Sequence, residues 1–280
     1  NSHHSGGAGK PLTDVTFMPY DGYFGKNVNT IDYVRRFLED SSSGVDLPAA
    51  FIVETIQGEG GINIASNKWL KSLYDLCKEF DILLIVDDIQ AGCGRTGSFF
   101  SFEEAGIEPD FVTLSKSLSG FGLQLSVLLL KPELDIWKPG EHNGTFRGNN
   151  MAFVSATEML HKFWSDDALV TQVSQKSEFL KSELKRIVDQ HISSDLEVRG
   201  KGLILGVDCR LPDLAKDIAD KCFENKLILE KCGSEDQVIK FMPPLVASQT
   251  VLERAIGAFE KSVKEVMSPE IKLAIQKVSN

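Results

Sequence analysis

The 280-residue sequence lacks several features that would assign a function directly. It has no run of basic residues and a formal net charge of −10, so nucleic acid and anionic membranes are poor partner candidates. Its longest apolar runs are too short to cross a bilayer, and no apolar segment after a basic start indicates a signal peptide. Its five cysteines are widely spaced, without a C-x-x-C pair, which predicts neither a disulfide framework nor a metal site. These absences favour a protein of the reducing cytoplasm.

Common catalytic signatures are also missing. The sequence contains no G-x-S-x-G, H-E-x-x-H or P-loop motif. Residues 92–97 match G-x-G-x-x-G, but residues 87–91 separate them from the preceding apolar run, and the phenylalanines that follow make a poor helix start. We therefore expect these glycines to form a turn that brings backbone close to the end of a strand, and not a nicotinamide site.

The pattern of the first half predicts an α/β fold. With 42% hydrophobic and 25% charged residues, the chain can bury the core of one large or two modest domains. Short apolar runs predict strands at 49–54, 82–86 and 111–114, and a further run spans 124–130. An amphipathic helix is predicted from about residue 67 to 80. A strand, a helix and a strand in this order predict a parallel pair.

From Met151 the pattern changes to longer helices and shorter strands. Helices are predicted at 151–164, 166–190, 214–224 and 248–266. Strands are predicted at 203–207, 227–229 and 238–242. We expect a large domain over residues 1–164 and a smaller α/β domain over residues 165–280.

Two polar residues follow neighbouring predicted strands. Asp87 comes directly after the run 82–86, and Lys116 comes shortly after the run 111–114. Because the carboxyl ends of parallel strands share one edge, which is where open α/β sheets bind ligands, both side chains are expected in one site. An amine and a carboxylate a cofactor's width apart suit pyridoxal 5′-phosphate (PLP), whose aldehyde reacts with the amine and whose ring nitrogen needs a carboxylate.

Asp87 and Asp88 could instead form a metal pair. Neither a histidine nor a third carboxylate lies close in sequence, so we do not expect a metal site. Side chains of adjacent strand residues point to opposite sides, so one of the two aspartates faces the site. We expect Asp88 to make a structural ion pair or hydrogen bond.

Three segments resemble the class III PLP-dependent aminotransferases. These are Asp87–Gly97 (DDIQAGCGRTG), Ser115-Lys116, and the acidic loop Glu54–Gly61 (ETIQGEGG). Cys93, Ser115–Gly120 (SKSLSG) and Lys138–Asn150 (KPGEHNGTFRGNN) are similar to the diaminobutyrate-forming branch of this family, which serves ectoine biosynthesis.

The resemblance implies roles for five residues. Lys116 would bind the aldehyde of PLP and carry the proton, and Asp87 would pair with the ring nitrogen. Ile89 would pack on the ring face and Gln90 would hydrogen-bond its phenolic oxygen. Thr145 would reach the phosphate from a neighbouring subunit, which implies a homodimer or higher homo-oligomer. Ile89 as a core residue and Thr145 as a loop hydroxyl remain alternatives.

Two more residues match the family's substrate site. Glu59 matches the acid that pairs with an arginine and controls which substrate enters, and Lys240 occupies the position of that arginine. Lysine cannot bind a carboxylate in the bidentate way arginine does, so this position departs from the family's usual glutamate-binding scheme and fits the ectoine-type branch. The segment Arg199–Gly202 resembles a turn with a structural role.

The family implies the type I PLP-dependent transferase fold, with the amino-terminal part of the large domain missing. The glycine-threonine phosphate loop and the ring-stacking aromatic of that part are not found, so we expect weak or absent PLP retention by these 280 residues. The implied reaction moves the amino group of L-glutamate to L-aspartate 4-semialdehyde. Another ω-aminotransferase acting on ornithine, acetylornithine or GABA, or a catalytically inactive homologue, are the alternatives.

Overall fold

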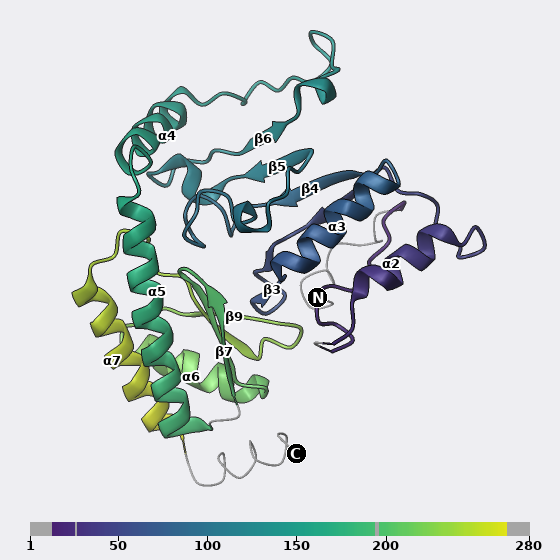
Figure 1. Ribbon diagram of the computed structural model, residues 1–280. Helices are drawn as coiled ribbons and strands as arrows, with labels where there is room; N and C mark the ends of the chain where they lie inside the picture. The colour runs from purple at the N-terminus through teal and green to yellow at the C-terminus, as the bar shows by residue number, and fades with distance from the viewer. Residues whose placement is uncertain (1–12, 26, 194–195, 268–280) are drawn as a thin grey trace.

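The computed structural model describes residues 13–25, 27–193 and 196–267, which form two four-stranded sheets, each with its own helices, and a two-stranded hairpin (Figure 1). The first sheet belongs to the amino-terminal half and the second to the carboxyl-terminal half. No helix within these residues is long and apolar enough to cross a membrane.

The first sheet is mixed and has the strand order β1-β4-β5-β6. Its strands are β1 (Ala50–Val53), β4 (Leu83–Asp87), β5 (Phe111–Leu114) and β6 (Val127–Leu130). The strands β1, β4 and β5 are parallel, as predicted, and β6 runs antiparallel to β5. The register places Asp87 opposite Thr113. The carboxyl ends of β1, β4 and β5 therefore share one edge.

Helices α3 (Asn67–Glu79) and α2 (Thr30–Glu39) lie beside this sheet (Figure 1). Helix α3 begins after Ser66, whose hydroxyl accepts a hydrogen bond from the N–H of Trp69 and so caps the helix. Its apolar face includes Trp69, whose indole N–H donates to the hydroxyl of Thr30 on α2 at 2.7 Å. This hydrogen bond links the two helices beside the first sheet.

The second sheet is antiparallel and has the order β7-β8-β10-β9. Its strands are β7 (Glu197–Lys201), β8 (Ile204–Asp208), β9 (Glu230–Cys232) and β10 (Val238–Phe241). Helices α5 (Ala168–Ile187), α6 (Pro212–Glu224) and α7 (Gln249–Val266) lie beside it (Figure 1), and a π-helical segment, Val188–Ile192, extends α5. Fully buried Leu205, Ile218, Ile239 and Phe259 belong to the core between sheet and helices.

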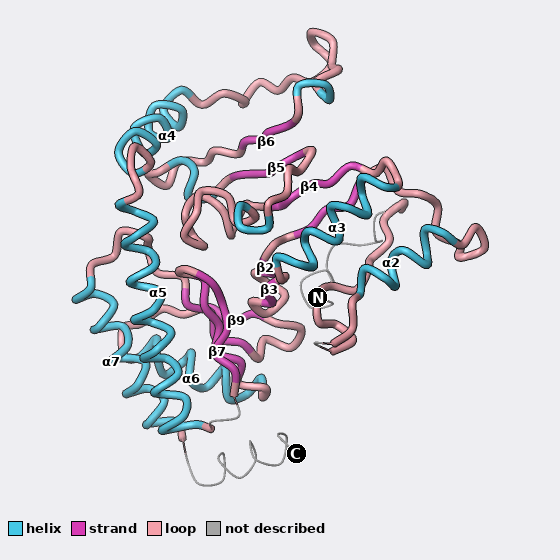
Figure 2. Tube along the Cα trace, in the orientation of Figure 1, coloured by secondary structure: helices cyan, strands magenta, loops and turns pink. Residues whose placement is uncertain are grey.

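A short hairpin lies between the two four-stranded sheets (Figure 2). It consists of β2 (Ile56–Gln57) and β3 (Asn63–Ile64), which are antiparallel. Ile56 and Ile62 of this hairpin pack with Ile204 and Val238 of the second sheet in a small separate core. The loop of the hairpin therefore rests on the second sheet although it follows β1 of the first.

The segments after β5 and β6 are less regular. They contain the 3₁₀ turns η2 (Lys116–Ser119) and η3 (Pro132–Leu134), and helix α4 (Asn150–Phe163) then leads into α5; a further 3₁₀ turn, η1 (Glu103–Ala105), precedes β5. A Cβ on Gly120, the residue after η2, would lie 2.5 Å from the Cβ of Met159 on α4. Glycine at this position therefore allows the segment of Lys116 to pack closely on α4.

Most predicted elements agree with the structure, with two differences in the second half. The predicted strand 227–229 is wrong, because these residues precede the strand and the pairing begins at Glu230. Strand β7 had not been predicted as a strand, because its sequence EVRGK lacks an apolar alternation. The domain boundary at residue 164 stays a prediction. It falls between α4, which ends at Phe163, and α5, which begins at Ala168.

The buried centre of the first sheet makes a stability prediction. Leu84 in β4 is 1% exposed, whereas Leu47, in the loop before β1, is 61% exposed. Leu84→Ala should lower the free energy of unfolding by about 2–5 kcal/mol, because it leaves a cavity between sheet and helix. The matched change Leu47→Ala should alter it by less than about 0.5 kcal/mol. Urea unfolding of both variants checks this, and equal losses would contradict the assigned core.

Candidate active site

The carboxyl edge of the first sheet carries Asp87 and Lys116, as the sequence predicts. Asp87 is the last residue of β4, and Lys116 begins η2 two residues after β5 ends. One carboxylate oxygen of Asp87, Oδ1, accepts hydrogen bonds from the N–H of Ile89 at 3.1 Å and from the hydroxyl of Thr113 at 3.3 Å. These two bonds orient the Asp87 carboxylate at the edge.

Lys116 has an unusual backbone conformation. Its φ of 49° lies in the left-handed region, which costs a residue with a side chain about 1–2 kcal/mol. The neighbouring Ser115 hydroxyl donates to the carbonyl of Leu125 at 2.8 Å and anchors the turn. The Lys116 side chain is exposed, and its charge lowers the pKa of both Glu54 and Glu59 as a minor contribution. The amine therefore lies in the same electrostatic environment as these two carboxylates.

Asp88 points into the protein, as expected, and is 1% exposed. Its carboxylate accepts hydrogen bonds from the hydroxyl of Ser101 and, at 3.1 Å, from the Ser101 N–H. Burial raises the pKa of Asp88 to about 6, although the two bonds from Ser101 act in the opposite direction. Asp88 thus holds the turn after β4 from the protein interior. Of the two aspartates, Asp87 is the one whose carboxylate lies at the sheet edge.

Gln90 brings an unsatisfied acceptor to the site. Its amide nitrogen donates to Glu59 Oε1 at 3.4 Å, but its buried Oε1 finds no hydrogen-bond partner among the residues that the structure describes. A Cβ on Gly58 would lie 1.7 Å from this oxygen, so the amide fits here because residue 58 is glycine. A buried acceptor without a donor is costly, and a bound ligand that donates would relieve the cost.

Glu59 and Lys240, predicted as a substrate-binding pair, are in direct contact. Lys240 Nζ lies 2.7 Å from Glu59 Oε1 and 3.0 Å from Glu230 Oε2. Burial alone would lower the pKa of Lys240, but the hydrogen bonds to the two glutamates outweigh it and the pKa is raised. Burial likewise opposes the ion pair at Glu59, where the Lys240 contact prevails and the pKa falls. Both groups are therefore charged at neutral pH.

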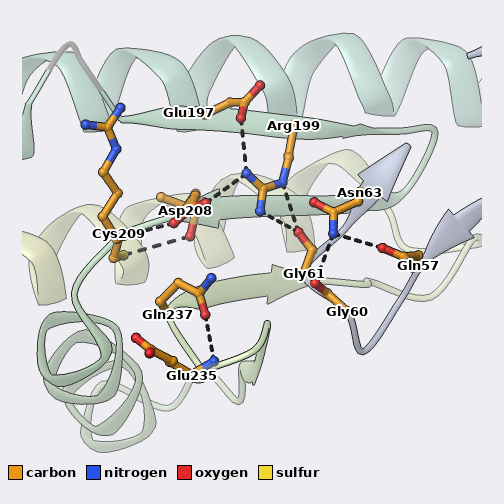
Figure 3. Close-up of polar contacts among 12 residues, drawn as sticks. Gln57, Gly60, Gly61, Asn63, Glu197, Arg199, Asp208, Cys209, Glu235 and Gln237 are labelled. Atoms are coloured by element: carbon orange, nitrogen blue, oxygen red, sulfur yellow. Dashed lines mark hydrogen bonds and ion pairs between the residues drawn. The ribbon is translucent and has the colours of Figure 1, made fainter. Parts of the chain in front are cut away.

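The second sheet holds the loop that carries Glu59. The N–H of Gly233 donates to the carbonyl of Glu59 at 3.0 Å. Arg199 on β7 donates to the carbonyl of Gly61 through Nε at 2.9 Å and Nη2 at 2.7 Å (Figure 3). The same guanidinium group pairs with Asp208 at 2.8 Å, which keeps Arg199 in place. These contacts give Arg199 the structural role expected for it.

Glu54 is a site residue that the sequence analysis did not select. It follows β1 at the same edge, and its Oε1 accepts a hydrogen bond from the N–H of Gly58 at 3.3 Å. Burial raises the pKa of Glu54, and the charges of Asp87 and Glu59 add to this effect. The sequence signal for Glu54 was its position at the end of the strand predicted at 49–54.

Two further residues were predicted to bind the cofactor, Ile89 and Thr145. Ile89 is half-buried and directly follows the two aspartates. Thr145 lies on the exposed loop between η3 and α4, which carries no other residue of the candidate site within the chain. Among the described residues there is no group of three or more histidine, cysteine, aspartate or glutamate side chains that could hold a metal ion.

Comparison with known proteins assigns the family. Residues 1–263 match the aminotransferase class-III family, and the chain belongs to it. The diaminobutyrate–2-oxoglutarate transaminase of Bordetella parapertussis is 53% identical over 271 residues, which are 96% of this chain and 62% of that protein. The transaminase of the same name from Vibrio parahaemolyticus is 49% identical over 98% of this chain and 65% of its own length. The chain thus spans somewhat less than two thirds of these relatives.

Solved structures confirm the fold. Ornithine δ-aminotransferase of Plasmodium falciparum superimposes with a TM-score of 0.73 at 29% identity, over 85% of this chain and 60% of that one. Ornithine aminotransferase of Toxoplasma gondii, with PLP at partial occupancy in its active site, gives a TM-score of 0.70 at 31% identity over 82% of this chain and 52% of its own. The fold is therefore the α/β fold of PLP-dependent aminotransferases, as the resemblance implied.

The burial of Asp88 predicts a pH-dependent stability. Because the pKa of Asp88 is raised in the folded protein, the group's stabilising contribution is complete below about pH 4 and is lost as the pH rises through about 6. The free energy of unfolding should fall by about 3 kcal/mol over this pH range, and Asp88→Asn should remove this pH dependence. Urea unfolding of both proteins at about pH 4.5 and pH 7.5 measures the difference. The same pH dependence in Asp88→Asn and in the unchanged protein would contradict the raised pKa of Asp88.

Proposed function

We propose that this chain is the catalytic part of a PLP-dependent aminotransferase that transfers the amino group of L-glutamate to L-aspartate 4-semialdehyde. The products are L-2,4-diaminobutyrate and 2-oxoglutarate, a reaction of ectoine biosynthesis. The observation that carries the proposal is the shared sheet edge of Asp87 and Lys116, in a chain about half identical to diaminobutyrate–2-oxoglutarate transaminases.

The residues at this edge fit PLP. The amide of Gln90, whose buried Oε1 has no partner among the described residues, can hydrogen-bond the phenolic oxygen of the cofactor. Asp87 offers a carboxylate for the ring nitrogen, and Lys116 offers an exposed amine for the aldehyde. When bound, PLP supplies an electron-withdrawing ring that stabilises negative charge on the substrate carbon.

The chain's own residues then have separate tasks. A carboxylate about 4 Å from a protonated ring nitrogen stabilises it by roughly 4 kcal/mol at an effective dielectric of 20, which is the task of Asp87. Ile89 covers the ring face and excludes water from it. Lys116 Nζ holds the cofactor and, when free, accepts and returns the proton at the reacting carbon. Its exposed position leaves the side chain room for both tasks.

Glu59 and Lys240 form the substrate end of the site. Lys240 makes two ion pairs, with Glu59 at 2.7 Å and with Glu230 at 3.0 Å, and its positive charge is offered to a substrate carboxylate in place of Glu59 when Glu59 moves. Lysine binds a carboxylate as a point charge, without the bidentate geometry of arginine. The site can therefore accept the different carboxylates of glutamate and of a four-carbon amino acid.

The proposed enzyme is a homodimer or higher homo-oligomer. The segment from Phe121 to Val154 exposes a series of large apolar side chains, which supports this proposal because interaction surfaces expose such residues. The most exposed are Phe121, Ile136, Phe146, Met151 and Val154. A second copy placed on this surface would let Thr145 reach the phosphate of its neighbour's cofactor.

A cytoplasmic location accords with the cysteines. All five are free and buried in the structure. Burial raises the pKa of Cys77 and Cys93 to about 12, which keeps these thiols protonated and unreactive. Unreactive free thiols suit a reducing compartment.

The reaction can be tested with the full-length protein. It should transfer the amino group from L-2,4-diaminobutyrate to 2-oxoglutarate, and borohydride should attach PLP to Lys116. Lys116→Ala should lose at least about 10³-fold in turnover and show no labelled peptide. Turnover of ornithine, acetylornithine or GABA without diaminobutyrate would replace the proposed substrate, and an unlabelled wild-type lysine would indicate an inactive homologue.

The shared site predicts complementation between subunits. Lys116→Ala and Thr145→Ala homodimers should each be impaired at limiting PLP, whereas mixed dimers of the two should regain one intact site per dimer. Activity of purified mixed dimers measures this, with Thr157→Ala, on α4, as the matched control change. Mixed dimers no more active than the average of the two parents would argue against a phosphate contact across subunits.

A further inference from the structure

Arg95 is a buried cation without a carboxylate partner among the residues that the structure describes. It is 8% exposed, and its Nη1 donates to two backbone carbonyls, that of Leu203 at 3.1 Å and that of Pro243 at 2.5 Å. Its Nε has no hydrogen-bond partner in the described part of the chain. Burial lowers the pKa of Arg95 to about 10, so the guanidinium group is charged at neutral pH. Burying an unpaired charge is costly, so core stability does not explain why an arginine lies here.

The two carbonyls belong to one end of the second sheet. Leu203 directly precedes β8, and Pro243 follows β10 by two residues. Strands β8 and β10 are antiparallel neighbours, so the beginning of one lies beside the end of the other. The Arg95 carbonyl also accepts a hydrogen bond from the N–H of Leu203 at 2.8 Å, and a Cβ on Gly202 would lie 2.2 Å from the Arg95 carbonyl oxygen. Arg95 therefore fastens the turn of residues 92–97 to this end of the sheet.

The turn is a close-packed unit that includes Gln90. The N–H of Gly92 donates to the carbonyl of Asp88 at 2.9 Å, and the N–H of Arg95 donates to the carbonyl of Gly92 at 3.2 Å. A Cβ on Gly92 would lie 2.6 Å from the Asp88 carboxylate, so this backbone has no room to rearrange locally. A displacement of Arg95 is therefore passed along the unit to Gln90.

The Gln90 amide occupies a narrow slot between two segments that the second sheet holds. One wall is the backbone of Gly58, where a Cβ would lie 1.7 Å from Gln90 Oε1. The hairpin loop that contains Gly58 is held by Arg199, which donates to the carbonyl of Gly61. The other side is the unit that Arg95 fastens to the same sheet. The width of the slot therefore depends on both arginines.

Resting on the proposed function, we infer that Arg95 is a positioning residue that holds the Gln90 amide where it meets the phenolic oxygen of PLP. Arg95 acts through the turn and has no contact with the cofactor in this role. Without the guanidinium group, the hydrogen bonds to Leu203 and Pro243 are lost and the turn can shift away from the hairpin loop. A residue that acts through Gln90 loses its effect on PLP affinity once the Gln90 amide is removed.

The test is a double-mutant cycle on the affinity for PLP, measured by titrating the full-length apoprotein with PLP and following its tryptophan fluorescence. Gln90→Ala should weaken PLP binding by about fivefold, the effect of losing one hydrogen bond. Arg95→Met removes the donors and keeps the apolar stem, and it should weaken binding by about threefold alone but by less than about 1.5-fold when residue 90 is already alanine. Arg254→Met, at an exposed position on α7, should leave the PLP affinity unchanged in both backgrounds.

A second variant serves if Arg95→Met does not fold. Arg95→Lys keeps a donor for one of the two carbonyls and should weaken PLP binding by about twofold, again only when the Gln90 amide is present. No loss from either change at Arg95, or equal losses with and without the Gln90 amide, would overturn the positioning role and leave the aminotransferase intact. A wild-type full-length protein that neither binds PLP nor is labelled at Lys116 by borohydride would overturn both the role and the proposed function.

Discussion

The parallel pairing of β4 with β5 is the constraint on which the rest of the site depends. It fixes Asp87 opposite Thr113, and the turn after β5 then delivers Lys116 to the same edge. Strand β1 adds Glu54 from the other side of β4. An antiparallel β4 or β5 would have sent one of these groups to the opposite end of the sheet, beyond the reach of any single small molecule.

The two ends of the site depend on different parts of the molecule. The proposed catalytic groups, Asp87 and Lys116, lie at the carboxyl edge of the first sheet, whereas Lys240 lies on β10 of the second sheet. The hairpin loop with Glu59 is held by Arg199 and Gly233 of the second half. In the proposed function, chemistry and substrate selection are therefore assigned to different sheets.

The sequence predicted those features that depend on short stretches of chain. Apolar runs between turn residues predicted the parallel strands, and the residues that follow those runs predicted Asp87 and Lys116, because strand ends follow from the pattern alone. It did not give β7, whose charged sequence pairs at an edge of the second sheet, or the partnership of Glu230 with Lys240. Both depend on strand register between segments far from obvious sequence signals.

The register of β9 against β10 has an evolutionary consequence. Lys231 stands opposite Ile239, so sliding β9 by one residue would place a lysine in front of Lys240 and turn its side chains to the other face of the sheet. A change in the turn between these strands, residues 233–237, that shifts this register would therefore alter the charge beside Lys240. Insertions and deletions in this gene lineage should be rarer there than in the exposed loop before α4.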